Sequence, residues 1–161
     1  MMRNNQQVQE LFAGRPFCTV EAVLPICVRI ARRSHWLLNN GWLPRLDAVP
    51  IVEWDPRRYN SIADHCANIA LDLGHDWNDD TGQGVATDAE DAPRIRLCVD
   101  GALRQQTVAA AGIVVYSYSS SLDRVLLRRA GRYLGPLRSS FEAELISLEW
   151  GLDAVIARPS G

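Results

Sequence analysis

The stretch RIRLCVDGA, residues 94–102, decides the fold class of the second half of this 161-residue chain. Apolar and polar residues alternate along it, so its aliphatic side chains share one face, as in a strand that is buried on one side. An aspartate before a glycine commonly starts a turn. We therefore expect a strand that ends at Asp100 and a turn that opens at Gly101.

Two more strands and a helix are predicted downstream of this stretch. Residues 111–118 and 124–133 have strand character, and the short loops between the segments favour antiparallel hairpins. Residues 139–142, SSFE, form a capping-box pattern, which predicts a helix that begins there. The apolar face of that helix is predicted to hold Phe141, Leu145, Leu148, Leu152 and Val155.

The first half, residues 1–73, predicts three helices and one strand. The helices are expected over 4–14, over 19–40, and from Asn60 or Ser61 to 73, where apolar residues recur at spacings of three and four. The sequence VPIVEW at 49–54 is typical of a short strand. Helices and strands alternating in this way indicate an α/β fold.

Residues 74–93 read as an acidic linker between the two halves. The sequence GHDWNDDTGQGVATDAEDAP has no apolar periodicity and is rich in Gly, Asp and Thr. Residues 72–91 contain seven of the 19 acidic residues, which leaves twelve acids against 17 basic residues elsewhere, although the whole chain carries a net charge of −2. A nucleic-acid partner is therefore compatible with the charge distribution. Lysine is absent and the 17 basic residues are all arginine. Arginine suits phosphate binding, but a bias in genome composition is the favoured explanation.

Hydrophobic content, the length of apolar runs and the cysteine spacing indicate which class of protein this is. Hydrophobic residues make up 47% of the chain, which is enough for a packed core. There is no apolar run of eighteen residues, so no membrane span is expected. The cysteines at 18, 27, 66 and 98 form no CxxC pair, which favours buried thiols of an intracellular protein over zinc ligands or disulfides.

Three acidic residues occupy positions where a functional carboxylate would be expected. Asp100 lies at the end of a strand, Glu144 lies one turn into a helix, and Asp64 lies in the first turn of another helix. Each has an ordinary explanation as well: a turn aspartate, a solvated helix residue, or an acid favoured by the helix dipole. Singly, none of them establishes a site.

Taken together, the segments of the second half resemble the front half of a type 1 ribonuclease H domain. The resemblance is carried by RIRLCVDGA (94–102), AAGIVVY (110–116) and SFEAELISLEWGL (140–152). In that family, a first strand bears a catalytic Asp, two antiparallel strands follow, and a helix bears a catalytic Glu in an A-E-L setting. The resemblance assigns those roles to Asp100 and Glu144.

The first half is similar to the back half of the same family. Residues 49–72, VPIVEWDPRRYNSIADHCANIALD, resemble its last strand and last helix in retroelement and plant-type members, and Asp64 falls on a metal-binding Asp. Residues 4–14 resemble the helix after the family's fourth strand, and Asn4 stands where a catalytic Asp is expected. Residues 1–73 thus precede, in permuted order, the front half at 94–161.

Two departures accompany this resemblance. The family's central fourth strand, which should precede Asn4, has no counterpart, and its mobile His is missing from 55–60. The permuted order is explained either by a circular permutant with one shared sheet or by a fragment of two tandem domains. We expect one incomplete mixed sheet in which 49–54 pairs with the strand at 94–100, with Asp64 close to Asp100.

The resemblance implies hydrolysis of the RNA strand of an RNA–DNA hybrid with two Mg²⁺ or Mn²⁺ ions. Asp100 would bridge the ions, with Glu144 on one and Asp64 on the other, while the neutral Asn4 would weaken binding. The hybrid would be recognised by its shape, and Arg57, Arg58 and Arg104 are candidate phosphate contacts. The alternatives are a catalytically inactive nucleic-acid-binding remnant and a structural domain. The sequence leaves the oligomeric state open.

Overall fold

The computed structural model describes residues 23–40, 60–82, 94–118, 124–137 and 139–157. The chain forms two compact units, Met1–Asp55 and Pro56–Gly161, and each is described by itself. In the first unit, the described element is helix α2, Leu24–Asn39. The helix and the strand that the sequence predicts over 4–14 and 49–54 lie outside the described residues.

Helix α2 confirms the central part of the helix predicted over 19–40. Pro25 lies at its start, where proline costs little because the first backbone N–H groups have no partner within the helix. Its buried residues are Ile26, Cys27, Ile30, Ser34 and Leu37, which recur at helical spacing. None of the described helices is long and apolar enough to cross a membrane.

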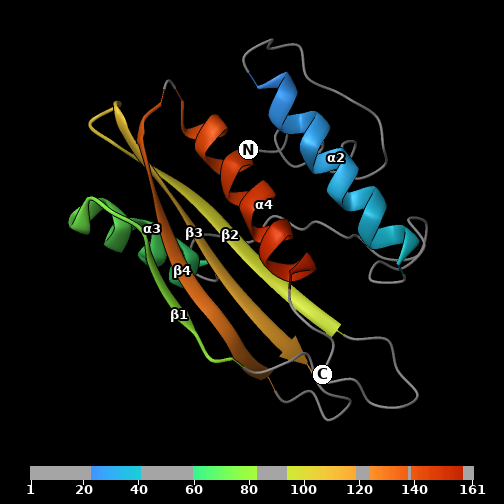
Figure 1. Cartoon of the computed structure of the whole chain (residues 1–161). Helices are drawn as coiled ribbons and strands as arrows, with labels where there is room; N and C mark the ends of the chain where they lie inside the picture. Colours follow the sequence, from blue (N-terminus) through green and yellow to red (C-terminus); the bar gives the residue numbers. More distant parts are fainter. Residues whose placement is uncertain (1–22, 41–59, 83–93, 119–123, 138, 158–161) are drawn as a thin grey trace. The chain divides into compact units, whose positions relative to one another are not determined.

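The second unit is built on a four-stranded antiparallel sheet in the order β1-β4-β3-β2 (Figure 1). Its elements in chain order are α3 (Ser61–Leu73), β1 (Trp77–Asp80), β2 (Arg94–Arg104), β3 (Val108–Tyr118), β4 (Arg124–Pro136) and α4 (Ser140–Ile156). The predicted α/β class and the predicted antiparallel hairpins are confirmed. The sheet is antiparallel throughout its described strands, and the mixed sheet that strand 49–54 would create stays a prediction.

Strand β2 corrects the prediction that the strand ends at Asp100. The strand continues to Arg104, and Asp100 pairs with Gly112 in its interior. The turn follows instead at Gln105 and Gln106, whose φ angles of 53° and 58° lie in the left-handed region. Gly101 therefore lies within the strand and does not open a turn.

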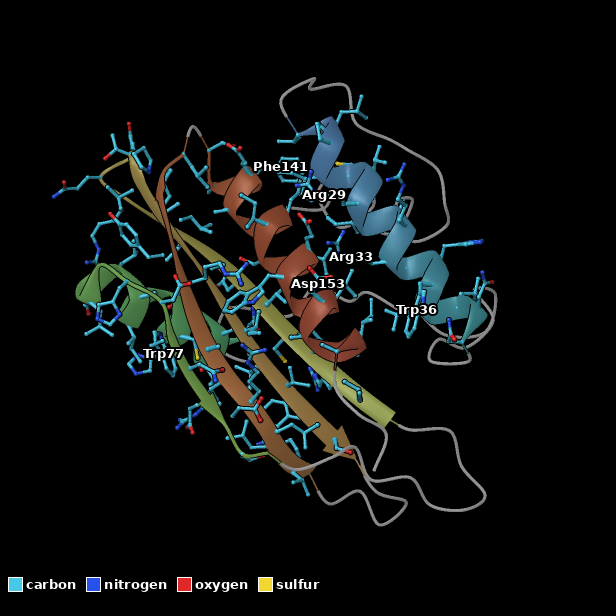
Figure 2. All side chains as sticks on the ribbon, in the orientation of Figure 1. Arg29, Arg33, Trp36, Trp77, Phe141 and Asp153 are labelled. Carbon is cyan, nitrogen blue, oxygen red and sulfur yellow. The ribbon has the colours of Figure 1, made fainter. Side chains whose placement is uncertain are left out.

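Strand β1 corrects the prediction that 74–93 is entirely a linker. Residues 77–80 pair with β4, and the carboxylate of Asp79 lies 2.6 Å from the guanidinium of Arg129. The indole Nε1 of Trp77, which is labelled in Figure 2, donates to the carbonyl oxygen of Cys66 at 3.0 Å. Cross-strand charge pairs and one anchored tryptophan thus hold a segment that lacks any apolar periodicity.

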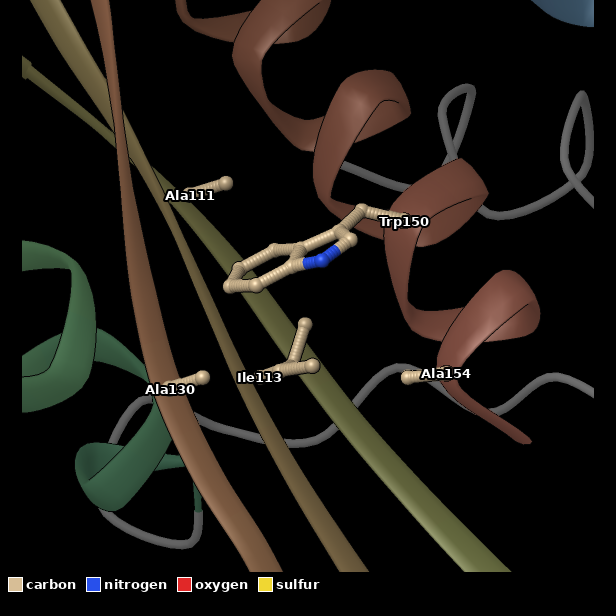
Figure 3. Close-up of a cluster of buried hydrophobic side chains, with 5 residues drawn as sticks. All are labelled: Ala111, Ile113, Ala130, Trp150 and Ala154. Carbon is tan, nitrogen blue, oxygen red and sulfur yellow. The ribbon is translucent and has the colours of Figure 1, made fainter. Parts of the chain in front are cut away.

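The two helices of this unit cover opposite faces of the sheet. On one face, Trp150 and Ala154 of α4 pack against Ala111, Ile113 and Ala130 (Figure 3). On the other face, two clusters join α3 to the sheet; they contain Ala63, Cys66, Ala67, Ala70 and Leu71 of the helix and Ala110, Val114 and Tyr116 of β3. Helix α3 comes from the first half of the sequence, so it and the strands of the second half share one core here.

Glycines let both helices approach the sheet closely at the level of Asp100. Asp100, Gly112 and Gly131 lie side by side on neighbouring strands. A Cβ atom at Gly112 would lie 2.7 Å from the amide nitrogen of Ala67 and would collide with the carbonyl of Ala63. The backbone of α3 therefore rests directly on this row of glycines.

Helix α4 uses a different face from the predicted one to contact the sheet. Its sheet-facing residues are Ala143, Ser147, Trp150, Gly151 and Ala154, as contacts with β2 and the buried cluster show. The predicted stripe with Leu145, Leu148, Leu152 and Val155 is buried as well, but it lies on the other side of the helix by the 100° advance per residue. The close approach requires small residues, which an apolar pattern alone does not select.

Candidate active site at Asp100 and Glu144

The site is centred on Asp100, a half-buried residue in the interior of β2. Side chains alternate along a strand. Cys98 and Ala102 both pack with α3, so Asp100 belongs to the same side of the strand. Among the described strands, β2 lies at one end of the sheet, and it is contacted by Asn60 at the start of α3 and by Ser147 of α4.

Glu144 is brought to Asp100 by the close contact between α4 and β2. A Cβ atom at Gly101 would lie 2.5 Å from the carbonyl carbon of Ala143 and 2.5 Å from the amide nitrogen of Glu144. Any larger residue at 101 would push this turn of the helix away. The start of the helix is fixed by Ser139, whose hydroxyl accepts from the Glu142 amide at 3.2 Å, as the capping pattern predicts.

The pKa of Glu144 is raised by burial and by the nearby charge of Asp100. Desolvation of its carboxyl group raises the pKa of Glu144, and the negative charge of Asp100 raises it further, although the residue as a whole is exposed. Two carboxylates that repel one another favour either a shared proton or a bound cation. The structure therefore brings together the two residues for which the resemblance implies catalytic roles.

Asp64 lies in the first turn of α3, half-buried, where the sequence predicts it. Its backbone carbonyl accepts from the side-chain amide of Asn68 at 2.9 Å. Within the described ranges, no three or more His, Cys, Asp or Glu residues form a group that could hold a metal ion. The shared metal site with Asp100 and Glu144 thus stays a prediction for Asp64, and Asn4 lies outside the described residues.

Of the three arginines predicted to contact phosphate, Arg104 lies within the described residues. Arg104 donates to a carboxylate oxygen of Asp72 at 2.8 Å and to the side-chain oxygen of Asn68 at 3.4 Å. Both groups of that ion pair are largely solvent-exposed, so the pair contributes little stability and can exchange for another anion. Arg57 and Arg58 lie outside the described residues.

Two residues of the site were missed from the sequence. The hydroxyl of Ser147 lies 2.8 Å from the carbonyl oxygen of Asp100, and the side-chain amide of Asn60 donates to the carbonyl oxygen of Val99 at 2.8 Å. Asn60 was interpreted only as a helix cap. Asn60 lies four residues before Asp64, so both residues share one face at the start of α3, and this spacing could have indicated a role for Asn60 in the site. No feature of the sequence indicated such a role for Ser147.

The donor set fits a hard divalent cation better than other chemistry. Carboxylate oxygens are the ligands that Mg²⁺ and Mn²⁺ prefer. The described cysteines Cys27, Cys66 and Cys98 form no disulfide bonds. Burial raises the pKa of Cys66 to about 11, which makes it a poor nucleophile at neutral pH.

No family model, no curated protein and no solved structure matches the chain.

Proposed function

We propose that the chain carries a ribonuclease H-like domain that binds divalent cations at Asp100 and Glu144 and hydrolyses the RNA strand of RNA–DNA hybrids, with impaired efficiency. The observation that carries the proposal is the Asp100–Glu144 pair. Desolvation and the neighbouring negative charge of Asp100 raise the pKa of Glu144, so both disfavour its ionised form. A bound Mg²⁺ or Mn²⁺ would favour the ionised form of both carboxylates.

The arrangement of the elements also supports this function. Three antiparallel strands lead into a helix with the A-E-L sequence, as in the family that the sequence resembles. The helix with the A-D sequence packs on the opposite face of the sheet. Asn60, the N-cap residue of that helix, donates to the carbonyl oxygen of Val99, one residue before Asp100.

The cations would activate water and stabilise the charge that develops on the phosphate. The role of the chain is to hold them: Asp100 and Glu144 offer carboxylate oxygens, and Asp64 is the third proposed ligand. Asn4 would supply a neutral oxygen where the family has a charged one. Affinity for the cation, and with it the rate, should therefore be low.

A titration of the purified chain with Mn²⁺ tests the proposal. Asp100→Asn and Glu144→Gln should each weaken binding strongly, because each removes a charged ligand. Glu142→Gln is the matched control, since Glu142 lies in the first turn of the same helix. Equal Mn²⁺ affinity of all three variants would rule the site out.

A second candidate function is a catalytically inactive nucleic-acid-binding remnant, which the Asn at position 4 favours. Such a protein would bind hybrid in a salt-dependent manner and release no cleavage product. Absence of hybrid binding at low salt would leave only a structural role. Binding and cleavage assays on the same preparation therefore separate the three functions.

A further inference from the structure

Two side chains from opposite faces of the sheet bind consecutive carbonyl groups of β2. The hydroxyl of Ser147 in α4 lies 2.8 Å from the carbonyl oxygen of Asp100. Asn60, at the start of α3, donates to the carbonyl oxygen of Val99 at 2.8 Å. Consecutive carbonyls of a strand point in opposite directions within the sheet, so the backbone at Asp100 is held from two sides.

Both side chains depart from what their positions in a helix ordinarily require. A buried helix serine usually bonds only the carbonyl four residues earlier, as Ser34 does to Ile30 at 2.8 Å. Ser147 makes that contact to Ala143 at 2.7 Å and also reaches Asp100. Its single proton thus lies between two acceptors, one on each element.

Asn60 shows the same departure. An N-cap asparagine usually accepts from a backbone N–H of its own helix. Asn60 makes no side-chain capping bond and reaches β2 instead. The Asn60 side chain therefore adds little to the stability of its own helix. It instead joins the start of α3 to β2 by a hydrogen bond that is partly shielded from water.

We propose that Ser147 and Asn60 are positioning residues for the cation site, an inference that rests on the function proposed above. Ser147 fixes β2 at Asp100 relative to the helix turn that carries Glu144. Asn60 fixes the same strand relative to the turn that carries Asp64. Ligands of a cation must be held to within a fraction of an ångström, and these two hydrogen bonds set the spacing between the three elements.

The test compares Mn²⁺ affinity, measured by electron paramagnetic resonance well below the unfolding temperature, for Ser147→Ala and Asn60→Ala. Their matched controls are Ser34→Ala and Asn40→Ala, because both of these side chains bond carbonyls four residues earlier in α2. Loss of an outer hydrogen bond at a metal site typically lowers affinity by a factor of roughly 10 to 100. We expect losses in that range for the two site variants and none for the controls. Ser147→Thr, which keeps the hydroxyl, should restore the affinity.

The possible outcomes separate the positioning role from the proposed function. Mn²⁺ binding by the wild type that is lost in Asp100→Asn, together with unchanged affinity in Ser147→Ala and Asn60→Ala, would retain the proposed function and overturn the positioning role. Wild-type protein that binds no Mn²⁺ would overturn both. Weak binding by Ser147→Thr would show that the hydroxyl is not the determinant.

Discussion

Gly101 and Ala143 touch through their backbones, so that no side chain fits between strand β2 and the first turns of helix α4. A Cβ atom added at Gly101 would lie 2.5 Å from the carbonyl carbon of Ala143 and 2.9 Å from its Cβ atom. The backbone atoms of a helix cannot move aside singly. This contact determines how near Glu144 comes to Asp100.

Gly101→Ala should therefore destabilise the protein by roughly 3 kcal/mol, at the upper end for overpacking, and should weaken Mn²⁺ binding. Gly135→Ala is the contrast: this glycine has open space around it but a φ of 73°, which costs alanine about 1 kcal/mol. Urea denaturation gives both values. A Gly101→Ala protein as stable as Gly135→Ala would contradict the close contact.

Glu144→Gln should change the pH dependence of stability. Because the folded-state pKa of Glu144 is raised above its ordinary value of 4.5, the folded state binds a proton more tightly than the unfolded state. Wild-type stability should thus fall as the pH rises from 4.5 through the folded pKa, and the penalty should persist above it. The variant lacks this penalty.

The stability advantage of Glu144→Gln over wild type should accordingly grow across that pH window and level off. Thermal unfolding in EDTA at a series of pH values measures it. Glu142→Gln serves again as the control. A constant difference between Glu144→Gln and wild type at all pH values would show that Glu144 titrates normally.

The β2–β3 turn offers a stabilising change. Gln105 and Gln106 both have positive φ, and the amide of Thr107 donates to the carbonyl of Arg104 at 3.2 Å, as in a type I′ hairpin turn. Replacing the pair with Asn-Gly should stabilise the protein by about 1 kcal/mol, because glutamine is strained there. Gln105→Val should destabilise the protein, because a β-branched residue is strained at a positive φ angle. Urea midpoints that move in the opposite direction for either change would contradict this turn geometry.

Trp77 should be required for β1 to remain on the sheet. Trp77→Phe loses the hydrogen bond to the Cys66 carbonyl, at a cost of about 1 kcal/mol. Trp36→Phe in α2 is the matched control, since Trp36 is 43% exposed. The amide of Thr81, bonded to the Leu127 carbonyl, should exchange faster in Trp77→Phe alone. Equal exchange in both variants would indicate that Trp77 does not anchor β1.

Cleavage of RNA–DNA hybrid by the chain should be weak or undetectable. The reason is the neutral Asn at position 4, where the family that the sequence resembles has an aspartate. Asn4→Asp should raise Mn²⁺-dependent cleavage measured on a labelled hybrid, and Asn4→Asp combined with Asp100→Asn should not. Robust cleavage by the unmodified protein would disprove the expected impairment.

The elements with regular periodicity could be predicted from the sequence. The helix at α3, the three long strands and the capped start of α4 follow from spacing, turn residues and Ser139. The proximity of Asp100 and Glu144 was also expected, although through resemblance rather than periodicity. Local pattern and global packing agree for these elements.

The remaining features depend on contacts between distant residues. Strand β1 forms because Asp79 meets Arg129 and because Trp77 reaches Cys66, and neither partner is visible from residues 77–80. The sheet-facing side of α4 is set by the close approach of Ala143 to Gly101 and by the packing of Trp150 on the sheet, whereas the leucine stripe that the periodicity picks out lies on the other side. Ser147 and Asn60 acquire their partners only when helices and strand meet.

The row formed by Asp100, Gly112 and Gly131 contains positions under two different constraints. Glycines at 112 and 131 are required by the close packing of α3 on the sheet, so relatives that keep this fold should retain them. Burial and the negative charge of Asp100 raise the pKa of Glu144, so the acidic pair costs stability unless the proposed cation binds there. Among natural relatives, the acidic pair should therefore be kept only where the proposed function is kept, whereas the glycines should persist wherever the fold does.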